Sequence, residues 1–312
     1  MSVILYRYDM SPFSKKISHV CLVKKNPQRW VTVSPIMPRS EITDTLGIGH
    51  RRIPILAIGR DVYLDTSLIA SALERRFSAG NTYGTIFPPR KGSTSCSDAA
   101  LMKIFSKWWA DEHLFMTLVQ LVLWDQAPEP FVADRATLLG GIPVEELKAK
   151  RPATTSKVAA QFALLEAQLA DWPNFLCVWS KENWAGSENQ LLDEGMTQFP
   201  HICAWMDRME EHIGALEAAQ PVTRLTSDEA IAEIAKGDVE PEDVVGFQEA
   251  EAARLGFKRG DLVSVVIDGP GNIPTIGPLI ALNQEEIVIE IEGQAGVLRC
   301  HFPRVFFTAT KV

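Results

Sequence analysis

The sequence predicts a layered α/β domain, followed by an all-α region and a strand-rich C-terminal region. Three observations support this prediction. Strand and helix signals alternate over residues 1–78, long helical patterns fill 97–218, and five short strand-like runs crowd into 258–312. Such alternation is typical of an α/β fold. Closely spaced short strands separated by turn residues are typical of a small antiparallel barrel.

Length and composition limit the class of protein. The chain has 312 residues and a formal net charge of -8. A single core rarely extends that far, so we expect two or three domains. The acidic balance argues against binding to nucleic acid, and no apolar run is long enough to span a membrane. The five cysteines are scattered without zinc-like spacing. We therefore expect no metal site and a reducing, cytoplasmic location.

The elements of the first region follow in order. Pro12 suits the first turn of a helix that begins after the first strand. Another helix is expected over 66–77, with Asp65 or Thr66 as its cap. Strands are expected at residues 3–8, 30–33, 54–58 and 61–64.

The rest of the chain divides at composition changes. Residues 79–95 are rich in Gly, Pro and Ser and predict a linker. A long helix is expected over 99–124, and then a Pro- and Gly-containing break over 127–143. Helices are expected at residues 144–171, 198–218, 228–236 and 243–255, and strands at 262–267, 276–282, 287–291, 297–301 and 305–310. The predicted units are residues 1–80, a linker 81–95, a helical domain 96–220 and an accessory domain 221–312.

Two short strings in the first region point to a binding site. Ser11 stands before Pro-Phe directly after the first strand, and Ile53-Pro54 precedes another strand. Asp65-Thr66 follows Ile53 by twelve residues. This order and spacing resemble the thioredoxin-like domain of cytosolic glutathione S-transferases. A serine before Pro-Phe is similar to the tau class, whereas omega-class relatives have cysteine there.

The resemblance covers roughly residues 1–218. Residues 199–209 are similar to a late helix of the family's all-helical second domain, which often carries Phe-Pro-x-x-x-x-Trp. The C-terminal strands are similar to an appendage of some fungal transferase-like proteins. The resemblance therefore implies a thioredoxin-like α/β domain, an all-α domain and an additional small C-terminal antiparallel β-barrel.

The same resemblance implies roles for individual residues. Ser11 would be the catalytic hydroxyl that donates to the sulfur of glutathione. The residues implied in glutathione binding are Arg39, Arg52, Ile53, Pro54, Asp65 and Thr66. Phe13, Trp108 and Phe115 would line the pocket of the second substrate, and the chain would form a homodimer.

These residue types carry the groups that binding glutathione and ionising its thiol require. A cis Pro54 would leave the backbone of Ile53 free to pair with a peptide. Asp65 can accept an ammonium, and Arg52 or Arg39 can bind a carboxylate. Lowering the pKa of a thiol by ~2 units requires ~2.7 kcal/mol. A hydrogen bond from Ser11 to the sulfur supplies ~1.5–3 kcal/mol, and a helix N-terminus adds ~0.3–1 kcal/mol.

Several alternatives stay open. In one alternative Ser11 serves only as the cap of its helix, and in another Tyr8 replaces it as the hydroxyl donor. Trp108 and Trp109 cannot share one helix face, and most of these tryptophans suit a core. The segment 174–197 departs from the family pattern, which puts the shape of the second-substrate pocket in question.

The favoured function is a glutathione-dependent transferase that acts on an electrophilic small molecule such as a secondary metabolite. A glutathione-dependent cis–trans isomerase of a conjugated alkene would use the same first step. A non-catalytic glutathione-binding or regulatory scaffold is the alternative of another class. A thiol-disulfide oxidoreductase is least favoured, because serine stands at positions 11 and 14.

Overall fold

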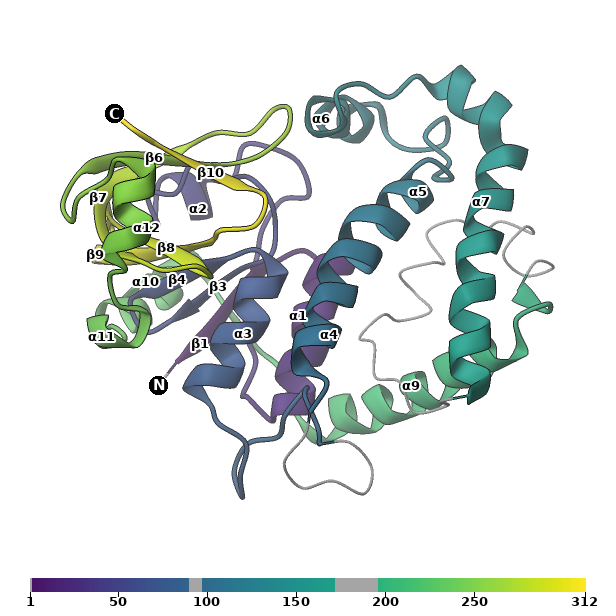
Figure 1. Ribbon diagram of the computed structural model, residues 1–312, viewed down its shortest axis with the longest axis horizontal. Helices are drawn as coiled ribbons and strands as arrows, with labels where there is room; N and C mark the ends of the chain where they lie inside the picture. The colour runs from purple at the N-terminus through teal and green to yellow at the C-terminus, as the bar shows by residue number, and fades with distance from the viewer. Residues whose placement is uncertain (1, 90–96, 172–195) are drawn as a thin grey trace.

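The computed structural model describes residues 2–89, 97–171 and 196–312, and shows a sheet on one side and long helices on the other (Figure 1). The strands are β1 (Val3–Arg7), β2 (Arg29–Thr32), β3 (Ile55–Ile58), β4 (Asp61–Leu64), β5 (Thr223–Leu225), β6 (Leu262–Ile267), β7 (Thr275–Leu282), β8 (Glu286–Gly293), β9 (Gly296–Pro303) and β10 (Phe307–Lys311). They form one ten-stranded sheet in the order β10-β6-β7-β8-β9-β4-β3-β1-β2-β5.

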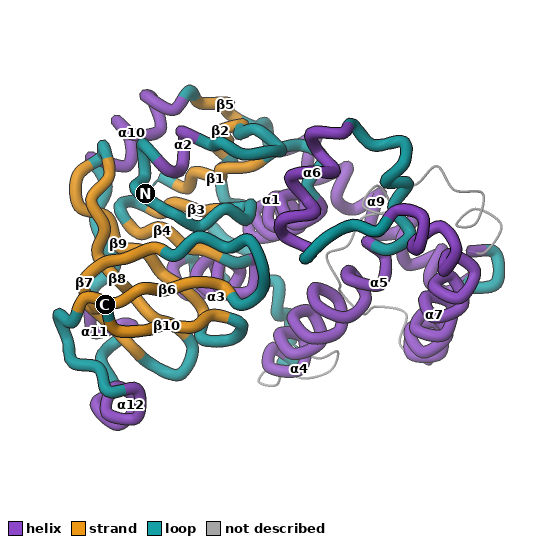
Figure 2. Tube along the Cα trace, turned by 90° about the horizontal axis from the view of Figure 1, so that it is seen from above, coloured by secondary structure: helices purple, strands orange, loops and turns teal. Residues whose placement is uncertain are grey.

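The helices between residues 99 and 219 form the other side of the molecule, whereas several shorter helices lie beside the strands (Figure 2). The helices are α1 (Pro12–Lys24), α2 (Ser40–Thr43), α3 (Thr66–Arg76), α4 (Ala99–Ile104), η1 (Phe105–Leu114), α5 (Phe115–Val119), α6 (Glu129–Leu139), α7 (Val144–Asp171), α9 (Pro200–Ala219), α10 (Ser227–Ala235), α11 (Glu242–Val245) and α12 (Glu249–Leu255). Among the described residues, no helix is both long and apolar enough to cross a bilayer.

The N-terminal elements confirm the sequence predictions. β1 runs parallel to β2 and antiparallel to β3, which in turn pairs antiparallel with β4. Pro12 opens α1 with Ser11 as its N-cap, and Asp65 caps α3. The Ile53–Pro54 peptide bond is cis, as expected.

Two apolar cores cover the two faces of this sheet. Val3 and Leu5 of β1 point to the face that α1 and α3 cover, while Ile4 and Tyr6 point to the opposite face. That opposite face is covered largely by residues beyond 220. Their contributions include Ala230, Ile234, Val263, Leu279, Ile289 and Phe302. The C-terminal region therefore shares its core with the N-terminal sheet.

The predicted C-terminal barrel is wrong, because the sheet is open. The last strands pair antiparallel with one another, as expected. However, β9 also pairs in parallel with β4, with Tyr63 opposite His301. β4 would otherwise be an edge strand with unpaired backbone groups, which readily accepts another strand. β9 therefore extends the N-terminal sheet, and the two ends of the open sheet are β10 and β5.

The helical region departs from prediction in two places. The expected break at 127–143 contains α6, because Pro130 lies in its first turn and Gly140, with φ of 73°, ends it. Both residues punctuate helix ends and do not exclude a helix between them. The long helix ends at Val119 and includes the π-helical stretch η1. Most of the segment 174–197 lies outside the described residues.

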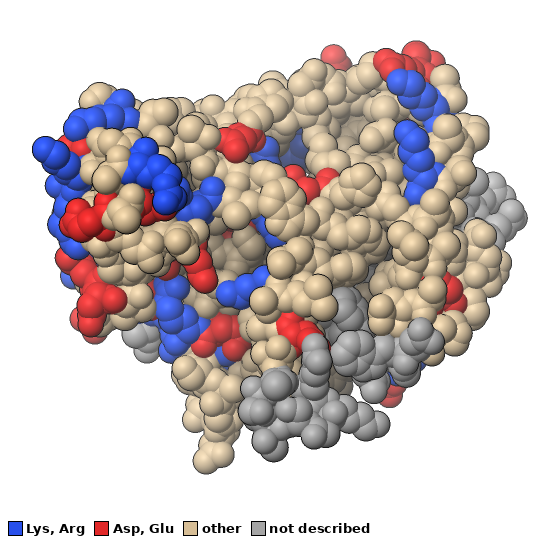
Figure 3. Space-filling model, in the orientation of Figure 1, with Lys and Arg blue, Asp and Glu red and all other residues tan. Residues whose placement is uncertain are grey.

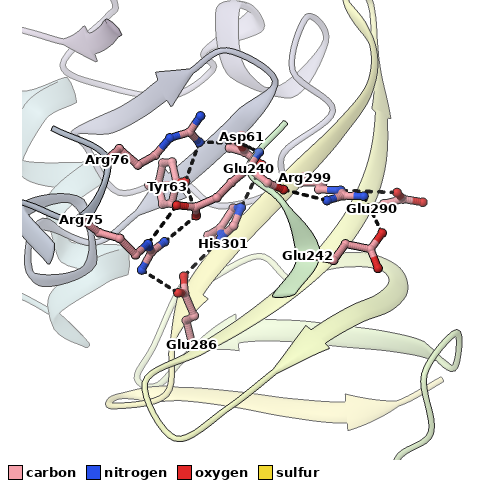
Figure 4. Close-up of polar contacts among 10 residues, drawn as sticks. All are labelled: Asp61, Tyr63, Arg75, Arg76, Glu240, Glu242, Glu286, Glu290, Arg299 and His301. Carbon is pink, nitrogen blue, oxygen red and sulfur yellow. Dashed lines mark hydrogen bonds and ion pairs between the residues drawn. The ribbon is translucent and has the colours of Figure 1, made fainter. Parts of the chain in front are cut away.

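Buried charges lie where β9 joins β4 (Figure 4). The two ring nitrogens of His301 lie 3.2 Å from Asp61 Oδ1 and 3.2 Å from Glu286 Oε2. Arg76 pairs with Asp61 at 2.5 Å, and Arg75 pairs with Glu286 at 2.9 Å. Because carboxylates only accept hydrogen bonds, both ring nitrogens of His301 carry hydrogen. Burial opposes this charge, but the two carboxylates outweigh burial and raise the pKa of His301.

Candidate functional site

The sheet topology brings the two predicted strings together. The end of β1 lies opposite the start of β3, with Tyr6 paired to Ile55, and the end of β4 lies opposite the same start, with Leu64 paired to Ile55. Asp65 directly follows β4, Ile53 lies two residues before β3, and Ser11 lies four residues after β1. The structure therefore places all three at the same end of these neighbouring strands.

Ser11 lies at the N-terminus of α1. Its Oγ accepts a hydrogen bond from the N–H of Ser14 at 3.1 Å, so it caps the helix. A hydroxyl can accept and donate at once, and no acceptor takes the Ser11 hydrogen among the described residues. The Ser14 hydroxyl is buried and has no hydrogen-bond partner among the residues that the structure describes. Capping thus leaves Ser11 able to donate to a sulfur.

The backbone of Ile53 is unpaired in the described part of the chain, since neither its N–H nor its C=O joins a hydrogen bond there. Ile53 stands just before β3 and is only partly buried. A bound peptide could therefore pair with it as an additional short strand.

Arg39 and Arg51 are both committed to internal contacts. Arg39 donates to the carbonyls of Ser34 at 2.7 Å, Pro35 at 2.9 Å and Arg51. Arg51 pairs with Asp134 of α6 at 2.8 Å. These arginines hold the loops beside the site, and the predicted role of Arg39 in binding glutathione stays a prediction.

Arg52 differs from both neighbours. It forms no hydrogen bond or ion pair with any residue that the structure describes. Burial lowers its pKa, although the charges of Glu112 and Asp65 oppose this effect. A partly buried guanidinium without a partner suits a carboxylate brought by a ligand.

Asp65 and Thr66 face a polar network on η1. Asp65, with φ of 69°, accepts from the Ser67 N–H at 2.9 Å, and its Oδ2 lies 2.8 Å from Lys107 Nζ. Burial would raise the pKa of Asp65, but Lys107 outweighs burial and lowers it. Thr66 donates to Asp111 at 3.3 Å. These contacts tie the start of α3 to η1.

Sequence reasoning missed Lys107 and Asp111. They stand four residues apart on the helix that carries Trp108 and Trp109, a spacing that places both on one helix side. Both are buried, and Asp111 also pairs with Lys16 of α1 at 2.7 Å. A basic and an acidic residue four positions apart on this aromatic-rich helix were the sequence signal that could have identified them as part of the site.

The aromatic residues predicted beside the second substrate separate into two groups. Phe13 and Phe115 lie in contact, with ring centroids 4.7 Å apart. Trp108 is 52% exposed and packs against Phe306 of the C-terminal region, at 4.7 Å. The hydroxyl of Tyr8 accepts from Arg135 at 3.0 Å; because its hydrogen can still be donated, Tyr8 stays the alternative hydroxyl donor.

The loop between β6 and β7 reaches α6 beside the site (Figure 1). A Cβ at Gly271 would lie 2.1 Å from the carbonyl oxygen of Thr137, and one at Gly269 would lie 3.9 Å from Arg52 Nη2. The C-terminal region therefore contributes a wall to the site next to Arg52.

We expect Gly271→Ala to destabilise the protein by about 2 kcal/mol or more, through left-handed strain and the loss of this close approach. Gly260→Ala is the control, because its φ of 85° gives comparable strain while nothing lies within 4 Å of the added Cβ. It should cost only about 1 kcal/mol. Thermal unfolding measures both variants, and equal losses would show that the loop does not need to dock on α6.

Charges of both signs gather over the sheet on the face shown in Figure 3, while much of the helical side is uncharged. The two signs are intermingled on the visible part of this face.

Comparison with known proteins bears on this site. Residues 5–82 match the family model described as glutathione S-transferase, N-terminal domain. The chain is similar to the crystal structure of a GST-like protein from Pseudomonas syringae, with 26% identity over 99% of both chains and a TM-score of 0.66. It is similar in fold to the β-etherase LigF from Sphingobium sp. strain SYK-6, with 20% identity over 70% of this chain and 100% of that chain and a TM-score of 0.50. No curated protein sequence matched the chain.

Proposed function

We propose, from the match of residues 5–82 to the N-terminal domain of glutathione S-transferases and the similarity to a GST-like protein over 99% of the chain, that the chain is a member of the cytosolic glutathione S-transferase superfamily. Its proposed function is that of a glutathione-dependent transferase acting on an electrophilic small molecule. The observation that supports the proposal most is a set of groups that keep unused hydrogen-bonding capacity within the described residues. The hydrogen of the Ser11 hydroxyl, the Ile53 backbone and the Arg52 guanidinium match a thiolate, a peptide backbone and a carboxylate. Glutathione offers all three groups.

In the proposed mechanism, Ser11 donates a hydrogen bond to the ionised sulfur of glutathione. The N-terminus of α1 adds a favourable field, since helix N-termini stabilise negative charge. The sulfur then forms a bond to an electrophilic carbon. In a substitution the leaving group departs with the displaced electron pair, and in an addition that pair moves to a neighbouring carbon or oxygen, which takes up a proton. Ser11 itself cannot form a mixed disulfide, so the proposed reaction proceeds by direct attack. Phe13 and Phe115 offer an apolar surface near Ser11 for the second substrate.

The test is calorimetric titration with reduced glutathione near pH 7. We expect the wild type to bind in the micromolar to low-millimolar range and to release a proton. In Ser11→Ala the pKa of the bound thiol should rise by about 1–2 units, because the lost hydrogen bond is worth ~1.5–3 kcal/mol. Proton release near pH 7 should therefore largely disappear in this variant.

Ser14→Ala is the matched control, because it removes a hydroxyl from the same helical turn and leaves Ser11 in place. It should release a proton like the wild type. Circular dichroism should accompany the titrations, since loss of the Ser11 cap costs about 1 kcal/mol. No binding of glutathione up to ~10 mM, or roughly 3 kcal/mol, would contradict the proposed function.

A further inference from the structure

The carboxylate predicted to bind the ammonium of glutathione already has a cation. Asp65 Oδ2 lies 2.8 Å from Lys107 Nζ, and Asp65 Oδ1 accepts hydrogen bonds from the N–H and hydroxyl of Ser67. A second cation on the same carboxylate would stand beside Lys107, where two positive charges repel each other strongly at a buried site.

The ion pair is shielded from water. The side chain of Lys107 is 8% exposed and that of Asp65 is 12% exposed. Glu112 also approaches Lys107, at 3.6 Å, but its side chain is 39% exposed, so solvent screens this interaction. Asp65 is therefore neutralised mainly by Lys107.

The C-terminal region holds Lys107 in this position. The Phe306 ring centroid lies 5.0 Å from Lys107 Nζ, within the range of a cation–π contact. The same ring packs against Trp108, the next residue on η1. Phe306 has φ of 64°, which is costly for a residue with a side chain and persists only where surrounding contacts fix it. The loop between β9 and β10 thus packs over the Lys107–Asp65 pair.

Other groups beside this pair favour an anion. Arg52 has no ion-pair or hydrogen-bond partner among the described residues, and Asp65 influences it electrostatically. Thr66 opens α3, whose N-terminal N–H groups can donate hydrogen bonds to a carboxylate. A cavity of about 320 Å³ adjoins the pair and is lined in part by Thr66, Ser67, Lys107, Trp108, Phe105 and Ile86. It offers space for an apolar group next to the ion pair.

We propose that Lys107 is a specificity-determining residue, and that this corner binds the γ-glutamyl end of the thiol peptide through its carboxylate without requiring a free ammonium. The substrate class then includes thiol peptides whose terminal amine is acylated, with the acyl group in the cavity beside Lys107. This inference rests on the proposed function, because it concerns the same site.

The test compares three thiols in calorimetric titrations: glutathione, N-acetylglutathione, and 4-aminobutanoyl-cysteinylglycine, which keeps the amine but lacks the γ-glutamyl carboxylate. For the wild type we expect N-acetylglutathione to bind within about threefold of glutathione, and the decarboxylated analogue to bind about tenfold or more weakly. Lys107→Met frees Asp65, so this variant should prefer glutathione to N-acetylglutathione by about tenfold.

Two further variants serve as controls. Lys107→Arg keeps the charge and should retain the wild-type ratio. Lys150→Met removes an exposed lysine on α7, where it pairs with Glu146 away from the cavity, and should also retain it. A wild type that rejects N-acetylglutathione about tenfold, with the ratio unchanged in Lys107→Met, would overturn this inference and leave the proposed function standing. Absence of binding by all three thiols would overturn both.

Discussion

Replacing His301 with leucine should lower the free energy of unfolding by about 3 kcal/mol at pH 6. Removing one partner of a buried ion pair typically costs about 3–5 kcal/mol, because the remaining charge is left uncompensated. Asp61 and Glu286 would lose the cation between them, although Arg76 and Arg75 would still pair with these carboxylates. The lower end of the range is therefore expected, which corresponds to a fall of roughly 5 °C in the melting temperature of a chain of this length.

The contribution of His301 to the free energy of unfolding depends on pH. The two carboxylates raise the pKa of folded His301, so its contribution to stability is complete below its unfolded pKa of about 6.5. That contribution is lost as the pH rises through the folded pKa. The pKa of Asp61 and of Glu286 is lowered, because His301 and the arginines outweigh burial. Their contributions are lost as the pH falls through the folded values.

The wild type should therefore lose stability between about pH 6.5 and the raised pKa of His301, and His301→Leu should lack this loss. Thermal unfolding across this range measures the difference. His212→Leu is the control, since His212 is exposed on α9 and should change stability little. A wild-type stability that is flat across this range, or that the His301 variant follows in parallel, would contradict a charged His301.

Local sequence patterns predicted most helices and strands, because the residues that specify such an element lie close together in the sequence. β6 begins and ends where alternation of apolar residues predicts, at Leu262 and Ile267. α6 was missed because Pro130 and Gly140 resemble a loop in composition, although they stand at its two ends. β5 has only three residues and depends on pairing with β2. Short pairings of this kind are decided by tertiary contacts and not by propensity.

The site was predictable only in part, for the same physical reason. The spacing of Ser11, Ile53 and Asp65 follows from strand and turn lengths, which local sequence carries. The ion pair between Asp65 and Lys107 joins residues that are 42 positions apart, and no spacing rule specifies it. Phe306 is still more distant and approaches Lys107 only because β9 pairs with β4. The sequence pattern of a strand does not indicate which other strand it will pair with.

The second large effect is expected when the chain ends at Gln220. The sequence predicts residues 221–312 as an accessory domain, and removal of such a unit would leave a folded remainder. In the structure, however, Ala230 and Leu279 pack in one core with Ile4 and Tyr6. Truncation would expose this face together with the free edges of β4 and β2, and exposed apolar surface and strand edges promote aggregation. We therefore expect the shortened protein to be largely insoluble.

Soluble yield, size-exclusion chromatography and thermal unfolding of the shortened chain measure this effect, and two substitutions in the full chain separate lost packing from lost length. Leu279 is fully buried in the shared core, whereas Leu262 is 47% exposed on the neighbouring strand. Leu279→Asp should destabilise the protein by about 4 kcal/mol or more, because it buries a charge without a partner, and Leu262→Asp should cost little. A soluble 1–220 fragment with cooperative unfolding would instead show that the C-terminal region is dispensable, since its half of the core would then not be needed for folding.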